Sequence, residues 1–233
     1  MSLYIALPLV AVFMNATLLA LAVLRRQGGP GLRPFTGLLA GMGLWALAIL
    51  AMRSSPVSGQ ALAWERVAFA IFPLISMLFL HFALRFTGAR VPGRFIPFAY
   101  ALALALSIIG PTSLVLRGMG EIPFGFGPVP GPLFLPWMQV MGLAVIAGFV
   151  LLARFLRSPR SRDERDMALY VLLGVGCGWL GAGTDYLASV KLLPYSGGIV
   201  GNILFAALVA VPLVRSGLPY LRSVARRARA HGL

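Results

Sequence analysis

Ionisable side chains are few in the interior of the long apolar segments, where a charge is costly and marks a candidate functional group, and two of them are considered first. Asp185 lies near the end of the sixth apolar segment, in the run GAGTDYLASV. It is a candidate ligand contact or a conformational latch to Arg66 or Arg53; the structural alternative is an ion pair or a hydrogen bond at a helix end. His81 lies in the third segment, one turn before Arg85. It is a candidate proton-sensitive group, although a lone histidine among Phe, Leu and Ala is more often a hydrogen-bonded packing residue.

Uncharged polar residues and aromatic residues form a second set of candidates. Gln139, Asn202 and Asn15 are expected to form hydrogen bonds between helices. An aromatic group around the longest connection would either line a pocket for an apolar ligand or form a hydrophobic lid on the bilayer surface. Its members are Phe124, Phe126, Phe134 and Trp137.

Several kinds of site do not suit the residues present. The single cysteine, Cys177, lies within an apolar segment, so neither an intramolecular disulfide nor a cysteine-based metal site is expected. The two histidines, His81 and His231, do not suit a bis-histidine haem, and no cluster has the spacing of metal ligands. The only lysine, Lys191, follows the sixth segment, whereas a retinal Schiff base needs a lysine within a helix. We therefore expect no catalytic residue, no metal and no cofactor.

The composition places these residues in a membrane protein. The 233 residues are 59% hydrophobic and only 11% charged, with a mean hydropathy of +0.90, whereas a soluble domain is about one quarter charged. The net charge of +14 comes from arginines at the ends of apolar segments, which indicates membrane topology rather than a nucleic-acid partner. Seven stretches are apolar and long enough for a membrane-spanning helix: about residues 3–24, 35–52, 60–88, 95–116, 135–156, 167–190 and 199–214.

This pattern predicts an all-α fold, a bundle of seven transmembrane helices packed around the third segment. The transmembrane domain is expected over residues 1–218, with a basic tail over residues 219–233 near anionic head groups of the lipid bilayer. Arginines are concentrated in alternate connections. By the positive-inside rule, this places the N-terminus outside and the C-terminus in the cytoplasm.

Two further patterns concern how the helices are joined and packed. The connection RGMGEIPFGFGPVPGPLFLP after the fourth segment is rich in Gly and Pro, which predicts a turn-rich or hairpin lid on the outer side. On the sixth segment Gly174, Gly178 and Gly181 share one helix face with Asp185. Small residues at this spacing predict the close approach of another helix.

The second, third and sixth segments also carry motifs of a known family. Trp45 lies in GLWALAIL, and the aromatic third segment WERVAFAIFPLISMLFLHFALRFTG ends with Phe82, Phe86, Thr87 and Gly88. An acidic residue followed by a short apolar loop occurs in GTDYLASVKLLPYSGGIVGNILFAAL. Over nearly the whole chain the sequence resembles the N-terminal seven-transmembrane sensor region of bacterial histidine kinases.

The resemblance implies a sensory module of the bacterial inner membrane that passes a signal to a cytoplasmic kinase or cyclase domain. Only the tail to Leu233 follows the seventh segment. We therefore expect a stand-alone receptor-like protein, an excised sensor region, or a family member used as a subunit of a membrane complex.

The first functional hypothesis is a non-enzymatic sensor that works with a separate kinase or another membrane protein. The alternative is an accessory or structural subunit of a membrane complex. A small transporter or channel comes third, because the residues at mid-depth are nearly all apolar. A small apolar or amphipathic ligand would sit between the outer ends of the third, fifth, sixth and seventh segments. The candidate ligand-binding residues are Trp64, Arg66, Trp137, Gln139, Asp185 and Asn202.

Overall fold

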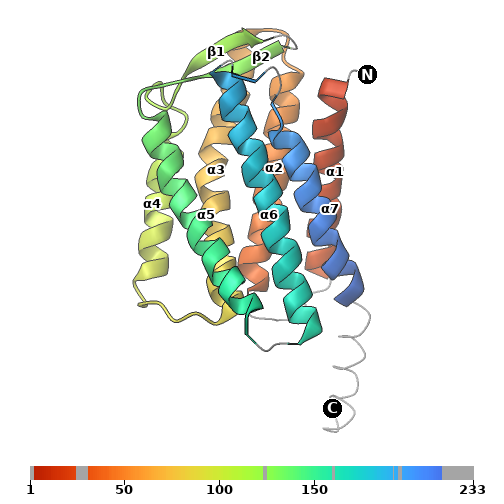
Figure 1. The fold of residues 1–233 in the computed structure, drawn as a ribbon. Helices are drawn as coiled ribbons and strands as arrows, with labels where there is room; N and C mark the ends of the chain where they lie inside the picture. Colours follow the sequence, from red (N-terminus) through yellow and green to blue (C-terminus); the bar gives the residue numbers. More distant parts are fainter. Residues whose placement is uncertain are drawn as a thin grey trace.

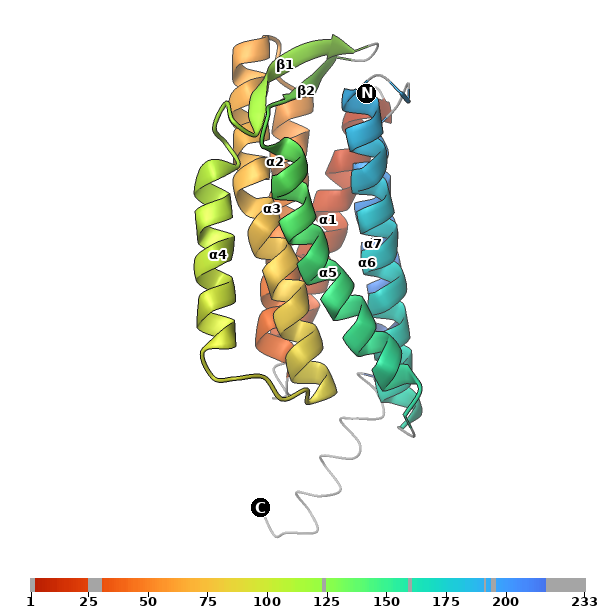
Figure 2. The ribbon, with the colours of Figure 1, turned by 60° about the vertical axis from the view of Figure 1, so that its left-hand side comes forward.

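The computed structural model describes residues 3–24, 31–122, 125–158, 161–190, 192–193 and 196–216. In this part of the chain, seven helices stand side by side and a two-stranded sheet lies across one end of them (Figures 1 and 2). The elements are α1 (Leu3–Leu24), α2 (Leu32–Arg53), α3 (Ser58–Thr87), α4 (Phe95–Ile109), β1 (Leu116–Ile122), β2 (Gly125–Pro130), α5 (Phe134–Leu156), α6 (Arg162–Ser189) and α7 (Gly198–Ser216). The basic tail expected over residues 219–233 lies outside the described residues.

The helices have the length and composition of membrane spans. Within the described residues, α1, α2, α3, α5 and α6 are long and apolar enough to cross a bilayer, and α4 and α7 are shorter apolar helices. Together they make the chain a multi-pass membrane protein. We call the end of the bundle that carries the sheet and the start of α1 the hairpin end (Figure 1).

Two helix boundaries differ from those expected from the sequence. The fourth helix ends at Ile109 rather than near residue 116, because Gly110 forms its C-cap and Pro111 does not continue a helix. The sixth helix begins at Arg162 rather than near residue 167. A reciprocal capping box starts it: the Ser161 hydroxyl accepts from the Glu164 N–H, and the Glu164 carboxylate accepts from the Ser161 N–H.

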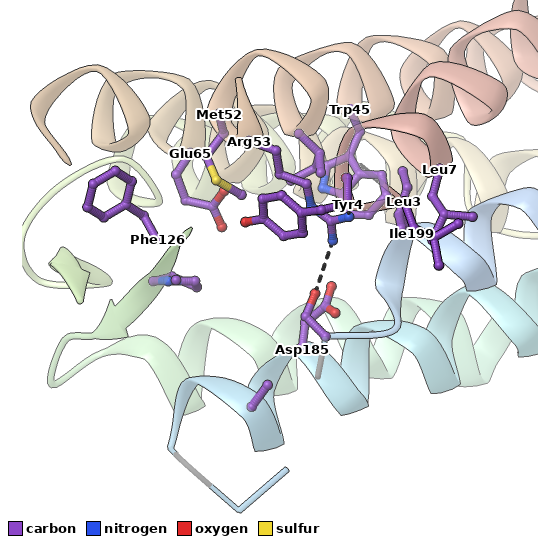
Figure 3. Close-up of a pocket in the computed structure, with 15 residues that line it drawn as sticks. Leu3, Tyr4, Leu7, Trp45, Met52, Arg53, Glu65, Phe126, Asp185 and Ile199 are labelled. Carbon is purple, nitrogen blue, oxygen red and sulfur yellow. Dashed lines mark hydrogen bonds between the residues drawn. The ribbon is translucent and has the colours of Figure 1, made fainter. Parts of the chain in front are cut away.

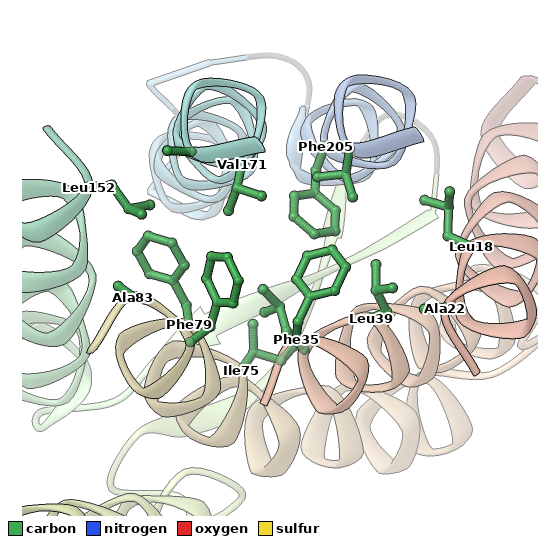
Figure 4. Packing of buried hydrophobic residues seen from close by; sticks show 14 of the residues in the cluster. Leu18, Ala22, Phe35, Leu39, Ile75, Phe79, Ala83, Leu152, Val171 and Phe205 are labelled. Atoms are coloured by element: carbon green, nitrogen blue, oxygen red, sulfur yellow. The ribbon is translucent and has the colours of Figure 1, made fainter. Parts of the chain in front are cut away.

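The third helix is the most buried of the five long helices, with 56% of its spanning window inside the protein. It packs against α2, α4 and α5, while α6 and α7 pack on each other and α1 joins α2 to α7. The main core cluster draws on α1, α2, α3, α5, α6 and α7 (Figure 4). Its largest members, Phe35, Phe79 and Phe205, are each at most 1% exposed. In lipid such packing, rather than water exclusion, holds helices together.

Glycines set the distance between α6 and α7, as the spacing on α6 predicted. A Cβ atom at Gly201 would lie 2.5 Å from the Cys177 carbonyl oxygen, and one at Gly181 would lie 2.9 Å from the Gly197 carbonyl oxygen. Both neighbours are backbone atoms, which do not move aside as a side chain does. The two helix backbones therefore touch near the hairpin end.

The long Gly- and Pro-rich connection forms an antiparallel hairpin, as its composition indicated. Strand β1 pairs with β2 in a register that places Gly118 opposite Val129 and Glu121 opposite Phe126. The strands contact α3 and α6. The hairpin therefore covers the bundle at the end where α1 begins (Figure 2).

Replacing Gly201 by alanine should push α6 and α7 apart. We expect Gly201→Ala to lower the stability by about 1–3 kcal/mol, the usual cost of overpacking, measured as the thermal unfolding midpoint in detergent micelles. Gly183→Ala on α6 is the matched control, since nothing lies within 4 Å of its added Cβ. It should leave the midpoint unchanged or raise it, and an equal loss in both variants would contradict this account of the contact.

Candidate ligand-binding site

A cavity of about 230 Å³ opens at the hairpin end of the bundle (Figure 3). Side chains of α1, α2, α3, α6 and the start of α7 form its walls, and β2 covers it. The lining is apolar apart from a few polar groups. These are Tyr4, Arg53, Glu65, Asp185 and Ser196.

Arg53, the last residue of α2, is held by two neighbouring segments. Its Nη1 donates to the Tyr4 carbonyl oxygen at 3.1 Å, and its Nη2 donates to the Ser196 hydroxyl at 3.4 Å. Its Cζ also lies 4.4 Å from the centre of the Tyr4 ring, a cation–π distance. The start of α1 and the loop before α7 thus both contact Arg53 and hold its guanidinium beside the cavity.

Asp185 fastens the start of α7 to α6. Its Oδ1 accepts from the N–H of Gly198, the first residue of α7, at 2.7 Å. The adjacent Thr184 hydroxyl accepts from the Gly197 N–H at 2.9 Å. A carboxylate at a helix N-terminus also interacts favourably with the helix dipole. The helix-end hydrogen bond expected as the structural alternative for Asp185 is therefore present.

The same carboxylate belongs to the polar group of the cavity. Asp185 interacts electrostatically with Arg53, and Arg53 also interacts with Glu65. Asp185 is therefore both a structural cap and a wall of the cavity. Of the two latch partners considered from the sequence, Arg53 is the one that faces it.

Glu65 is the least expected member of the site. It is only 6% exposed, and its Oε2 has no hydrogen-bond partner in the described part of the chain. The buried Nε of Arg53 is also unpartnered there. A buried polar atom without a partner costs about 1–3 kcal/mol. Such atoms on a cavity wall are the arrangement expected where a bound molecule supplies the missing hydrogen bond.

Residues 7–216 match the protein family described as the N-terminal 7TM region of histidine kinase. The chain belongs to this family. No curated protein and no solved structure matches it. The membership confirms the resemblance seen in the sequence and makes the chain a membrane sensor module in signalling, linked through its family to histidine kinases.

Of the six candidate residues proposed from the sequence, Asp185 lines the cavity at the hairpin end, Trp137 and Asn202 line neighbouring cavities, and the other three are exposed. Trp64 is 42% exposed, and Arg66 and Gln139 are also exposed. Successive residues of a helix point about 100° apart, so Trp64 and Arg66 flank the buried Glu65. Their part in ligand binding stays a prediction.

The sequence nevertheless held a signal for Glu65. It shares a helix face with Ala61 and Ala68, which are 0% and 1% exposed. This phase predicts an inward side chain, whereas the run Trp64-Glu65-Arg66 by itself is typical of a membrane interface. The cavity lies between α1, α2, α3, α6 and α7, whereas the sequence suggested a ligand between the outer ends of the third, fifth, sixth and seventh segments. That ligand position stays a prediction.

Trp137 lies in an aromatic group beside the cavity. It is buried, its Nε1 donates to the Leu106 carbonyl oxygen at 3.0 Å, and its ring stacks on Phe69 at 5.2 Å. The group lines an adjoining cavity of about 80 Å³ that shares Glu65 and Asp185 with the first. Of the other aromatic residues singled out, Phe126 lines the first cavity, Phe134 lines the second, and Phe124 lies outside the described residues.

Asn202 lies deeper in the bundle and joins three helices. Its Oδ1 accepts from the Asn15 side chain on α1 at 2.7 Å, and its Nδ2 donates to the Met42 carbonyl oxygen on α2 at 3.2 Å. The interhelical hydrogen bond expected from these two asparagines is confirmed. Asn202 also lines a cavity of about 50 Å³ between α2, α3, α5, α6 and α7.

His81 takes no part in this site. Its Nδ1 lies 3.0 Å from the Tyr100 hydroxyl on α4, and its Nε2 accepts from Arg85 at 3.5 Å. These contacts are those of the hydrogen-bonded packing residue considered from the sequence. Among the described residues, no group of three or more His, Cys, Asp or Glu side chains is placed to hold a metal ion.

The cap formed by Asp185 can be tested by its stability. Asp185→Ala removes the acceptor of the Gly198 N–H, and hydrogen bonds to charged groups contribute about 1.5–3 kcal/mol. We therefore expect a lower thermal unfolding midpoint in detergent, with Asp185→Asn intermediate because its amide oxygen keeps an acceptor. Glu121→Ala, an exposed carboxylate on the hairpin, is the control. If the alanine variants at 185 and 121 unfold at the same temperature, the cap does not hold α7.

Proposed function

We propose that this protein is a non-enzymatic sensor that binds a small ligand at the hairpin end and reports it to a kinase at the opposite end. The observation that carries the proposal is the buried Glu65 Oε2, which lacks a partner beside a cavity of about 230 Å³. Binding sites in membrane helix bundles commonly combine an apolar wall with few polar groups. The cavity under the hairpin has this character.

The distribution of arginines supports an outward-facing hairpin end. Exposed arginines crowd the opposite end of the bundle, at both ends of the connections between helices there. By the positive-inside rule this end is cytoplasmic, in a bacterial inner membrane. The described members are Arg33, Arg85, Arg90, Arg94, Arg154, Arg157, Arg162 and Arg165.

The route from the cavity to the cytoplasmic end runs along α6 and α7. Both helices contact the cavity near the hairpin, through Asp185 on α6 and Ile199 on α7. Their backbones touch at Gly181 and Gly201, so a displacement of one helix acts on the other. Helix shifts of about 1–2 Å at such contacts are a common form of transmembrane switching. Pro73 in α3 and Pro212 in α7 are candidate pivots.

The proposed receiver is a histidine kinase, in keeping with the family. Helix α6 begins at the cytoplasmic end with a charged turn that includes Arg162, Asp163 and Glu164. Such a surface suits polar contact with a partner protein. The alternative of an accessory subunit gains no support from a cavity with unpartnered polar atoms.

Filling the cavity should move the cytoplasmic ends of the helices. In a Cys177→Ser background, nitroxide labels are attached to cysteines replacing Arg85 on α3 and Arg162 on α6, both exposed. Ala188→Trp then places a bulky ring into the cavity that Ala188 lines. We expect the distance between the labels, measured by double electron–electron resonance in nanodiscs, to change by about 1–2 Å or more.

Leu187→Trp is the matched control for this measurement, because Leu187 is the adjacent residue and is exposed. The Leu187→Trp variant should give the same distribution of label distances as the labelled protein that carries no tryptophan substitution. A filled cavity with an unchanged distribution would contradict the proposal that the hairpin end communicates with the cytoplasmic end.

A further inference from the structure

We propose that the ligand of this cavity is a small organic amine, bound in its protonated form with its ammonium group at Glu65. The inference rests on the proposed function and names the chemical class that the same site would recognise. Glu65 Oε2 is buried and unpartnered on the cavity wall. A carboxylate accepts hydrogen bonds and attracts positive charge, so the missing partner is a donor, and a cationic donor is the strongest.

The balance of charge around the cavity also favours a cation. Two carboxylates, Glu65 and Asp185, line it together with one guanidinium, that of Arg53. When all three are ionised, the described part of the lining carries one unmatched negative charge. At the low dielectric of a membrane protein such a charge is costly, and an ammonium group would balance it.

The guanidinium of Arg53, the cation among the described lining residues, already has hydrogen-bond partners. Arg53 donates to the Tyr4 carbonyl and the Ser196 hydroxyl and lies over the Tyr4 ring. In the described part of the chain it donates no hydrogen bond to Glu65 Oε2. Arg53 interacts electrostatically with both Asp185 and Glu65, but the hydrogen-bonding capacity of Glu65 Oε2 stays open for a ligand.

The walls indicate that the cation is organic rather than a metal ion. Apart from the polar group, the cavity is lined by apolar side chains, such as Leu7, Ile199 and the aromatic Phe126. The adjoining cavity of about 80 Å³ is lined by aromatic residues, including Trp45 and Phe72, and it reaches the same two carboxylates. Aromatic faces beside carboxylates are a known setting for ammonium groups. This shape suits an amine whose apolar body occupies one of the two cavities and whose ammonium group lies at the carboxylates that the two cavities share.

The test compares three probes that share a phenyl-ethyl body and differ in their polar group: phenethylamine, 2-phenylethanol and phenylacetate. Binding to the full chain in nanodiscs is measured by isothermal titration calorimetry, after subtracting titrations into empty nanodiscs to remove partition into lipid. We expect saturable binding of phenethylamine, with the alcohol and the carboxylate about tenfold or more weaker, as for loss of a charge-assisted hydrogen bond.

Two variants locate the amine, and a third serves as their control. Glu65→Gln should weaken phenethylamine about tenfold or more while leaving 2-phenylethanol unchanged, and Ala188→Trp should abolish binding of every probe by filling the cavity. Glu121→Gln, an exposed carboxylate at the same end of the bundle, should bind phenethylamine as the unaltered protein does.

Equal binding of amine and alcohol, preferred binding of phenylacetate, no saturable binding of phenethylamine, or full amine affinity in Glu65→Gln would each overturn the inference. The label distances in the ligand-free Ala188→Trp variant judge the sensor proposal separately, because they depend on the cavity and not on the class of ligand.

Discussion

A helix bundle in lipid has to satisfy its own polar groups, because the hydrocarbon offers no water to do so. Most of this protein obeys that constraint closely. Asn15 pairs with Asn202, Trp137 donates to the backbone of α4, and Asp185 caps α7. Four buried side-chain atoms have no partner among the described residues: Asn15 Oδ1, Arg53 Nε, Glu65 Oε2 and Ser107 Oγ. Of these, Glu65 Oε2 is the carboxylate oxygen, and it lies on a cavity wall. An unpartnered buried group is expected where a protein loses some folding stability in order to bind another molecule.

The two ends of the bundle differ in where their charged side chains lie. At the hairpin end three charged groups, Arg53, Glu65 and Asp185, line a cavity that β2 and the surrounding helix ends close. At the opposite end the arginines are exposed, and the helices meet through tightly packed phenylalanines such as Phe82, Phe86 and Phe155. One end thus encloses a cavity lined by buried charged groups, and the other exposes its arginines.

The sequence was sufficient for features that depend on local chemistry. Apolar length predicted the helices, glycine spacing predicted the close approach of another helix to α6, and Gly and Pro predicted the hairpin. It located Asp185 and Asn202 because a polar residue within an apolar run stands out. It also contained signals that were overlooked, namely the stop at Gly110-Pro111 and the capping box from Ser161 to Glu164.

The remaining features depend on how helix ends meet in space, which the sequence does not specify. Tyr4 begins α1 and Arg53 ends α2, so each by itself is typical of a membrane interface, yet they meet beside Ser196. Glu65 was overlooked because Trp64 and Arg66 on either side are interface residues. The signal that Glu65 points inward was its position on the helix face of Ala61 and Ala68.

The central claim is that Glu65 is kept for a ligand and not for the fold. Its most direct test is the thermal unfolding midpoint of Glu65→Leu in ligand-free micelles, compared with the unaltered chain. Replacing an unpartnered buried carboxylate by an apolar group of similar size removes a penalty of about 1–3 kcal/mol, so the midpoint should rise. A midpoint that falls would show that the fold itself needs the carboxylate, and would contradict this account.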